Sequence, residues 1–171
     1  MSVLFLHGAG GYDDDQTMVA ELREHLDGPV QAPRLPDEDM SYDAWRRVVS
    51  GHLHDLGPDV AVVAHSFGAS VALRHAVDER PPLAALVLLA MPYWGPTGWG
   101  VAEYALPASF VPPPPQLRVS LHHCHDDQEV PFEHLAHHAA ALPDAVVRAH
   151  PTGGHQLTDR MGAVALDLAP A

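Results

Sequence analysis

The chain has 171 residues, of which 47% are hydrophobic, and a formal net charge of -13 at pH 7. This length and apolar content indicate a single globular domain over residues 1–171 and exclude a disordered, fibrous or membrane-spanning chain. All nine basic residues are arginines, so a lysine Schiff base is excluded. The negative charge would repel phosphate backbones, and we therefore expect no nucleic-acid partner.

The cysteine content and the first residues bear on the cellular compartment. Cys124 is the single cysteine and cannot form an internal disulfide, so the cysteine count gives no sign of an oxidising compartment. The apolar run at residues 3–6 is too short for the core of a signal peptide. No apolar run approaches the roughly 20 residues that cross a bilayer. We expect a cytoplasmic protein with no membrane partner.

Short apolar runs alternate with longer amphipathic stretches along the chain, which is typical of βα units around a parallel sheet. The short runs predict strands at residues 3–6, 30–32, 60–64, 83–89, 117–121 and 145–149. The amphipathic stretches predict helices at residues 16–26, 42–56, 67–77, 132–141 and 159–168. Several strands are apolar at consecutive positions, as expected when helices cover both faces of a sheet. The pattern indicates an α/β domain with a mostly parallel sheet of about six strands.

Three consecutive acidic residues, Asp13, Asp14 and Asp15, precede the first predicted helix. Carboxylates at this position complement the partial positive charge of a helix N-terminus. We therefore expect a solvated helix start, and a calcium site is the alternative interpretation.

The strand at residues 60–64 turns into a helix at Ser66. Ala64 and Gly68 stand two residues before and two residues after this serine, so the segment matches G-x-S-x-G with alanine in place of the first glycine. Such a sharp turn holds the hydroxyl clear of the sheet and directs the N–H of Phe67 toward the space above it, where it can stabilise an oxyanion. A plain serine N-cap on an ordinary helix is the alternative.

A glycine-rich turn, His-Gly-Ala-Gly-Gly at residues 7–11, follows the first strand. Backbone amides in such a turn can approach a ligand without steric hindrance. The N–H of Ala9 is the predicted second oxyanion donor. The glycines lack the G-x-G-x-x-G register of a dinucleotide site.

Acidic residues and a histidine follow the last two strands. Asp126 and Asp127 come after the fifth strand, and His155 lies in a glycine-containing turn after the sixth. A serine, then an acid, then a histidine is the chain order of the triad in α/β-hydrolases. Since each residue follows the carboxyl end of a predicted strand, we expect Ser66, one of the two acids and His155 to meet at one edge of the sheet.

On these residues the chain resembles the α/β-hydrolases, and among them the small cap-less serine hydrolases of the retinoblastoma-binding-protein-nine and YdeN type. The resemblance covers essentially the whole chain and rests on Ala64-His65-Ser66-Phe67-Gly68, Asp126-Asp127-Gln128-Glu129-Val130-Pro131, Gly154-His155, and Leu35-Pro36-Asp37 followed by Tyr42-Asp43-Ala44-Trp45. It implies a single-domain α/β-hydrolase fold with a minimal cap or none. It also implies that the acid is Asp127, four residues before Pro131, and that Asp126 is its neighbour.

These motifs and the resemblance predict a serine hydrolase that uses no cofactor and no metal. Ser66 is the expected nucleophile, His155 its base, and Asp127 the carboxylate that orients the histidine. The expected partner is a small-molecule ester or thioester. Two alternatives stay open, namely a binding protein with a weakly used triad, and an acyltransferase or perhydrolase on the same triad.

Residues 91–115 interrupt the alternation with a long loop rich in glycine and proline. The loop carries the aromatic residues Tyr93, Trp94, Trp99, Tyr104 and Phe110. It leaves the sheet at a strand's carboxyl end, where α/β sites lie, so we expect an apolar wall or small flap that favours uncharged, apolar acyl groups. Packing of the loop onto the body of the domain is the alternative.

Several other histidines are candidates for substrate or metal binding. His7 and His65 flank the predicted oxyanion region and are candidate substrate contacts, with the filling of strand ends as the plainer role. The residues His122, His123, Cys124 and His125 alternate between the two faces of a strand. At most two ligands then share a face, fewer than zinc takes, so we expect no metal site there. We expect Cys124 to be a small buried hydrophobic residue.

Overall fold

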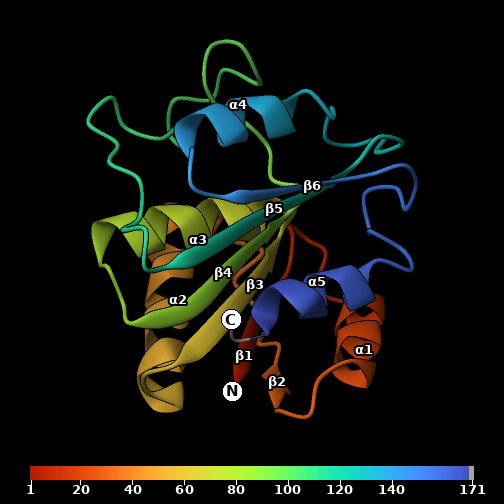
Figure 1. Cartoon of the computed structure of the whole chain (residues 1–171). Coiled ribbons are helices and arrows are strands. Elements are labelled where there is room, and N and C mark those ends of the chain that lie inside the picture. The colour runs from red at the N-terminus through yellow and green to blue at the C-terminus, as the bar shows by residue number, and fades with distance from the viewer. Residues whose placement is uncertain (170–171) are drawn as a thin grey trace.

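The computed structural model describes residues 1–169, and its six strands form one parallel sheet (Figure 1). The strands are β1 (Val3–Leu6), β2 (Val30–Gln31), β3 (Val60–His65), β4 (Leu83–Leu89), β5 (Arg118–Cys124) and β6 (Val146–His150). The helices are α1 (Gln16–Glu24), α2 (Tyr42–Leu56), α3 (Ser66–Asp78), α4 (His134–Ala141) and α5 (Met161–Leu168). The strand order is β2-β1-β3-β4-β5-β6. This order reverses between β1 and β3, and open α/β sheets bind ligands at such a point, beyond the carboxyl ends of the strands.

Helices cover both faces of the sheet, with α1 and α5 on one face and α2, α3 and α4 on the other (Figure 1). Successive side chains of a strand point to opposite faces. In β1, Val3 and Phe5 join the hydrophobic core under α1 and α5, whereas Leu4 and Leu6 join the core under α2 and α3. All four are buried, which explains why this strand is apolar at consecutive positions. The predicted α/β class with a parallel six-stranded sheet is confirmed.

The predicted elements all form, and most boundaries shift by one to three residues. The strand β3 continues to His65 and α3 begins at once with Ser66, so no residue separates the strand from the helix. The strand β5 extends to Cys124, beyond its predicted end at residue 121. The helix α1 ends at Glu24, short of the predicted residue 26, because Asp-Gly-Pro follows at residues 27–29 and favours a turn.

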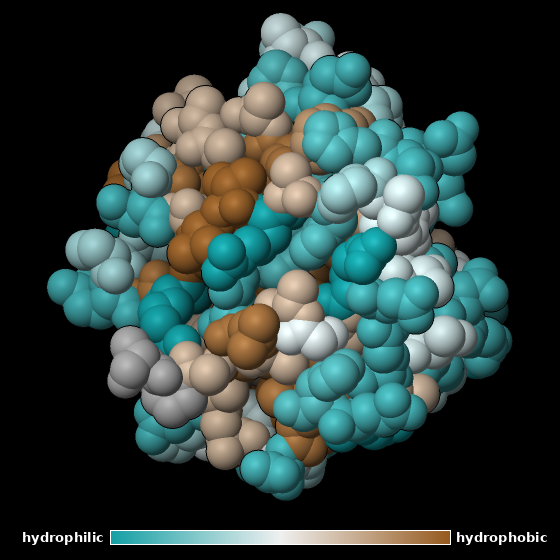
Figure 2. Space-filling view, turned by 45° about the vertical axis from the view of Figure 1, so that its right-hand side comes forward, coloured by the Kyte–Doolittle hydropathy of each residue, from teal (hydrophilic) through white to brown (hydrophobic). Residues whose placement is uncertain are grey.

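The edge strand β6 carries exposed hydrophobic side chains. Val146 and Val147 are 45% and 44% exposed, and Leu166 on the neighbouring α5 is 75% exposed. Figure 2 shows hydrophobic and hydrophilic residues in adjoining patches on one side of the molecule.

None of the helices within residues 1–169 combines the length and the apolar content that crossing a bilayer requires.

Candidate active site

The junction between β3 and α3 is a tight turn that raises Ser66 above the sheet. Ser66 has a φ of 52°, a left-handed conformation that side-chain-bearing residues rarely adopt outside strained functional turns. Two glycines make room for it. A Cβ on Gly68 would lie 2.4 Å from the carbonyl oxygen of His7, and a Cβ on Gly8 would lie 3.2 Å from the Cβ of Ser66. The small residues of the motif therefore allow α3 and the turn after β1 to pack directly against each other.

Asp127 lies just after β5 and is fully engaged by hydrogen-bond donors. Its Oδ2 accepts from Nδ1 of His155 at 2.9 Å and from Nε2 of His123 at 3.1 Å. Its Oδ1 accepts from the backbone N–H of Glu129 at 2.8 Å and of Val130 at 2.9 Å. Burial by itself would raise the pKa of this carboxyl, but the four donors outweigh burial and hold the pKa well below its ordinary value. Asp127 is thus a carboxylate with a fixed orientation.

The neighbouring acid, Asp126, has a different environment. It is exposed, and its two oxygens accept the backbone N–H groups of Gly153 and Gly154 at 3.3 and 2.8 Å. These contacts anchor the loop that carries His155. The structure therefore places Asp127, and not Asp126, next to the imidazole of His155. Asp126 instead binds the backbone of the loop that carries His155.

His155 presents one ring nitrogen to Asp127 and leaves the other available. The bond to Asp127 requires a proton on Nδ1, so Nε2 of the neutral ring is an acceptor. The nearest carboxylate to Nε2 is Glu129, whose Oε2 lies 3.7 Å away on a side chain that is 70% exposed. Within residues 1–169, Ser66 Oγ makes no hydrogen bond to His155, although both residues line one cavity.

The two predicted oxyanion donors lie at the same cavity as Ser66. Ala9 and Phe67 both line it. The first amides of a helix have no partner inside that helix and carry a partial positive charge, which applies to Phe67 at the start of α3. The turn that carries Ala9 is held by a hydrogen bond from Gly10 N–H to the Asp37 carboxylate at 3.1 Å. Ala9, Phe67 and Ser66 therefore share one cavity.

The cavity has a volume of about 350 Å³ and is walled on one side by aromatic rings. Its charged lining residues are acidic, and neither lysine nor arginine contributes to it. The apolar part of the lining comes from Met40, Phe67, Pro92, Trp94, Trp99, Tyr104 and Val130. The lining therefore presents apolar surface and acidic side chains beside Ser66.

The loop at residues 91–115 packs on the domain and also forms the cavity wall. The indole N–H of Trp94 donates to Oγ of Ser70 on α3 at 2.8 Å. The centroid of the Trp94 ring lies 4.9 Å from that of Trp99 and 5.0 Å from that of Tyr104. The Tyr104 ring in turn contacts Phe67 at 4.9 Å. Trp94, Trp99 and Tyr104 thus line the cavity and also pack the loop onto the domain, whereas Tyr93 and Phe110 do not line it.

Of three further predicted substrate contacts, the structure places His7 and Tyr93 outside the cavity and His65 at its border. His7 is 2% exposed and does not line the cavity, because its Nδ1 donates to the carbonyl of Gly8 and its Nε2 accepts from Leu35 N–H. Tyr93 also lies off the cavity and stacks on His137 of α4 at 4.4 Å. His65 borders the cavity, but both its ring nitrogens are occupied by protein groups.

Sequence reasoning missed three residues of the site. His123 donates to Asp127, and the four-residue spacing of this pair was its only signal. The carboxylate of Glu129 lies 3.7 Å from Nε2 of His155. Asp15 is not part of a solvated helix start, since its side chain is 1% exposed and turns inward to His65. In the described part of the chain, no group of three or more histidine, cysteine or acidic side chains could hold a metal ion. Cys124 is buried, and burial raises the pKa of its thiol to about 11.

Comparisons with known proteins identify the fold. No family model and no curated protein matches the chain. Among solved structures, the ydeN gene product from B. subtilis has a TM-score of 0.71 at 19% identity, with 98% of this chain and 97% of that chain covered. Est1E from Butyrivibrio proteoclasticus, with ferulic acid bound, has a TM-score of 0.72 at 16% identity, with 98% and 86% covered. Mouse alpha/beta hydrolase domain-containing protein 10 has a TM-score of 0.69 at 17% identity, with 97% and 86% covered.

Proposed function

We propose that this chain, which has the α/β-hydrolase fold, is a serine hydrolase that cleaves ester or thioester bonds through an acyl-enzyme on Ser66. The observation that carries the proposal is the hydrogen bond from His155 Nδ1 to the buried Asp127, at a cavity that also contains the strained Ser66. This arrangement supplies a nucleophile, a base with a free nitrogen and a group that fixes the tautomer of the base.

The proposed reaction begins when His155 Nε2 accepts the proton of Ser66 as its oxygen attacks the ester carbonyl carbon. The carbonyl oxygen becomes an anion and receives hydrogen bonds from the N–H groups of Phe67 and Ala9. His155 then gives the proton to the leaving alcohol or thiol, and the acyl group stays on Ser66. A water molecule, deprotonated by the same histidine, releases the acid and restores the serine. Asp127 stabilises the transient imidazolium in both steps.

The lining of the cavity supports a substrate with a small, uncharged and apolar acyl group. Trp94, Trp99 and Tyr104 offer apolar surface beside Ser66, and the acidic residues of the lining would repel an anionic acyl group. The acyl acceptor is water in this proposal, and transfer to another alcohol or to peroxide would use the same acyl-enzyme.

One observation favours a second candidate, a binding protein with a hydrolase fold. Ser66 Oγ and His155 form no hydrogen bond in the described residues, and Glu129 lies near the nitrogen that would accept the proton. Such a protein would hold a small apolar ligand in the cavity without turning it over.

Labelling with a fluorophosphonate separates the two candidates, because this probe reacts with an activated serine without requiring the native substrate. We expect label on Ser66 of the wild type and none on Ser66→Ala. Ser109→Ala, at an exposed serine of the 91–115 loop, is the matched control and should label like the wild type. Folded wild-type protein that stays unlabelled would refute the hydrolase and favour the binding protein.

A further inference from the structure

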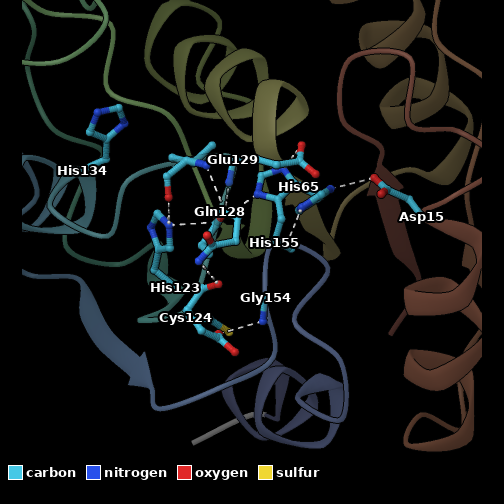
Figure 3. A network of polar contacts seen from close by, with 12 residues as sticks. Asp15, His65, His123, Cys124, Gln128, Glu129, His134, Gly154 and His155 are labelled. Carbon is cyan, nitrogen blue, oxygen red and sulfur yellow. Dashed lines mark hydrogen bonds and ion pairs between the residues drawn. The ribbon is translucent and has the colours of Figure 1, made fainter.

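A second aspartate–histidine pair lies directly beside the proposed triad. Asp15 Oδ2 is 2.8 Å from Nδ1 of His65, and the two side chains are 1% and 2% exposed. His65 is the last residue of β3, immediately before Ser66. Its Nε2 is 2.9 Å from the backbone carbonyl oxygen of His155. Figure 3 shows His65 between Asp15 and His155.

The hydrogen-bond acceptors around His65 define what this pair can do. Both ring nitrogens of His65 face oxygen acceptors, a carboxylate and a carbonyl, so both contacts are hydrogen bonds only when both nitrogens carry protons. Burial by itself would raise the pKa of Asp15, but the hydrogen bond and charge of His65, together with the N–H of Gly8, lower it. His155 differs, because its Nε2 has no acceptor at hydrogen-bond distance.

The same carboxylate ties together three segments of the site. Asp15 Oδ2 also accepts the backbone N–H of Gly8 at 2.8 Å, next to the proposed oxyanion donor Ala9. His65 connects this carboxylate to the loop of His155, and the rings of the two histidines lie 4.6 Å apart at 52°. The pair therefore links the glycine turn after β1, the end of β3 and the loop after β6.

We propose that Asp15 and His65 act as positioning residues, which hold the backbone of His155 so that its imidazole stands between Asp127 and Ser66. Asp127 binds only the Nδ1 edge of that ring, and the exposed Asp126 anchors the loop through Gly153 and Gly154, two residues and one residue before His155. The clamp on the carbonyl of His155 fixes the residue itself. This inference rests on the proposed hydrolase function for its effect on rate, although the clamp can be measured without turnover.

Two substitutions of His65 separate positioning from packing. In His65→Gln the side-chain amide reaches the place of Nε2 and can still donate to the carbonyl of His155, whereas the Asp15 bond is lost. In His65→Asn the shorter amide reaches the place of Nδ1 and keeps the Asp15 bond but loses the His155 bond. If the buried pair has a purely structural role, His65→Asn should lose less activity than His65→Gln. If the pair positions His155, His65→Gln should lose less activity than His65→Asn.

We expect His65→Asn to lower kcat for a p-nitrophenyl ester about 10- to 100-fold with little change in KM, since small misplacements of reacting groups have effects of this size. In His65→Gln we expect kcat for the same ester to fall by about threefold or less. His54→Asn, at an exposed histidine of α2, is the matched control. Equal losses in the two His65 variants, or the larger loss in His65→Gln, would overturn the proposal.

A spectroscopic readout keeps the inference independent of turnover. The ring ¹⁵N and low-field ¹H signals of His155, assigned by their loss in His155→Gln, report its bond to Asp127. We expect these signals to shift or broaden in His65→Asn and to stay close to wild type in His65→Gln. If His65→Asn does not fold, Asp15→Asn should give the same change, and unchanged signals in the folded variants would refute the clamp. A wild type that fails to react with fluorophosphonate would refute the hydrolase, while the His155 signals would still decide the clamp.

Discussion

Replacing Asp127 by asparagine tests the proposed triad most directly. The carboxylate accepts two backbone N–H groups on Oδ1 and two imidazole N–H groups on Oδ2. If the amide oxygen keeps the backbone donors, the new NH₂ group meets N–H groups of His123 and His155. His155 can relieve this conflict by moving its proton to Nε2 and accepting from the amide at Nδ1. The nitrogen that should take the proton of Ser66 is then already protonated.

We expect this tautomer change to reduce kcat by a factor on the order of 10⁴, which is the loss measured for the same substitution in a serine protease triad. A factor of this size corresponds to about 5.5 kcal/mol in the activation barrier. The free energy of unfolding should fall by roughly 2–3 kcal/mol, because one charge-assisted hydrogen bond is lost. His123 keeps the carbonyl of Val130 as an acceptor at 3.0 Å.

The assay is hydrolysis of p-nitrophenyl butyrate, together with urea unfolding to verify the fold. Asp126→Asn is the matched control, because this exposed residue keeps an oxygen for Gly154 and does not contact the imidazole. A loss in Asp126→Asn as large as that in Asp127→Asn would refute the assignment of the acid. Activity within about tenfold of wild type in Asp127→Asn would refute the tautomer argument.

Further predictions concern stability and the cavity wall. Burial lowers the pKa of His122 and of His138 to about 4. The unfolded chain therefore takes up these protons first, and the free energy of unfolding should fall as the pH drops from about 6.5 to 4, then fall further as Asp127 is protonated. Urea unfolding across this range measures the slope, which should be shallower in His138→Gln, and a flat profile would contradict the prediction. Gly68→Ala places a methyl group 2.4 Å from a backbone carbonyl and should destabilise the fold by about 1–3 kcal/mol. Gly51→Ala, where a Cβ would meet nothing within 4 Å, should instead be neutral or stabilising by about 0.5–1 kcal/mol, and equal effects of the two substitutions on urea unfolding would refute the steric argument. Trp94→Ala and Trp99→Ala should extend the range of p-nitrophenyl ester chain lengths that are hydrolysed, with Val111→Ala, an exposed residue of the same loop that is not in the cavity lining, as control. An unchanged chain-length profile in both folded tryptophan variants would assign the two rings to packing alone.

The sequence by itself determined the order and type of the elements. Hydrophobic periodicity is a local property, and consecutive apolar positions such as Val3 to Leu6, in a run this short, are typical of a strand covered on both faces. The turn at Ser66 could also be predicted from the sequence. The left-handed conformation and the close approach of α3 require small residues, and Ala64 and Gly68 lie close to Ser66 in the chain. The carboxyl ends of parallel strands meet at one edge, so the approach of Asp127 and His155 followed from their places after β5 and β6.

The partners of each side chain were decided only by the tertiary structure. Asp15 belongs to an acidic triplet whose members look alike in sequence, yet it alone is buried, because the turn before α1 brings it 2.8 Å from His65, 50 residues away in the chain. His7 precedes the glycine turn and was expected at the substrate, but the backbone of Leu35 and Gly8 saturates its ring. Hydrogen bonds have a range of about 3 Å, so their pairing depends on packing between distant segments. That packing leaves no periodic trace in the sequence, which is why the framework of the site was predictable and the network that orients His155 was not.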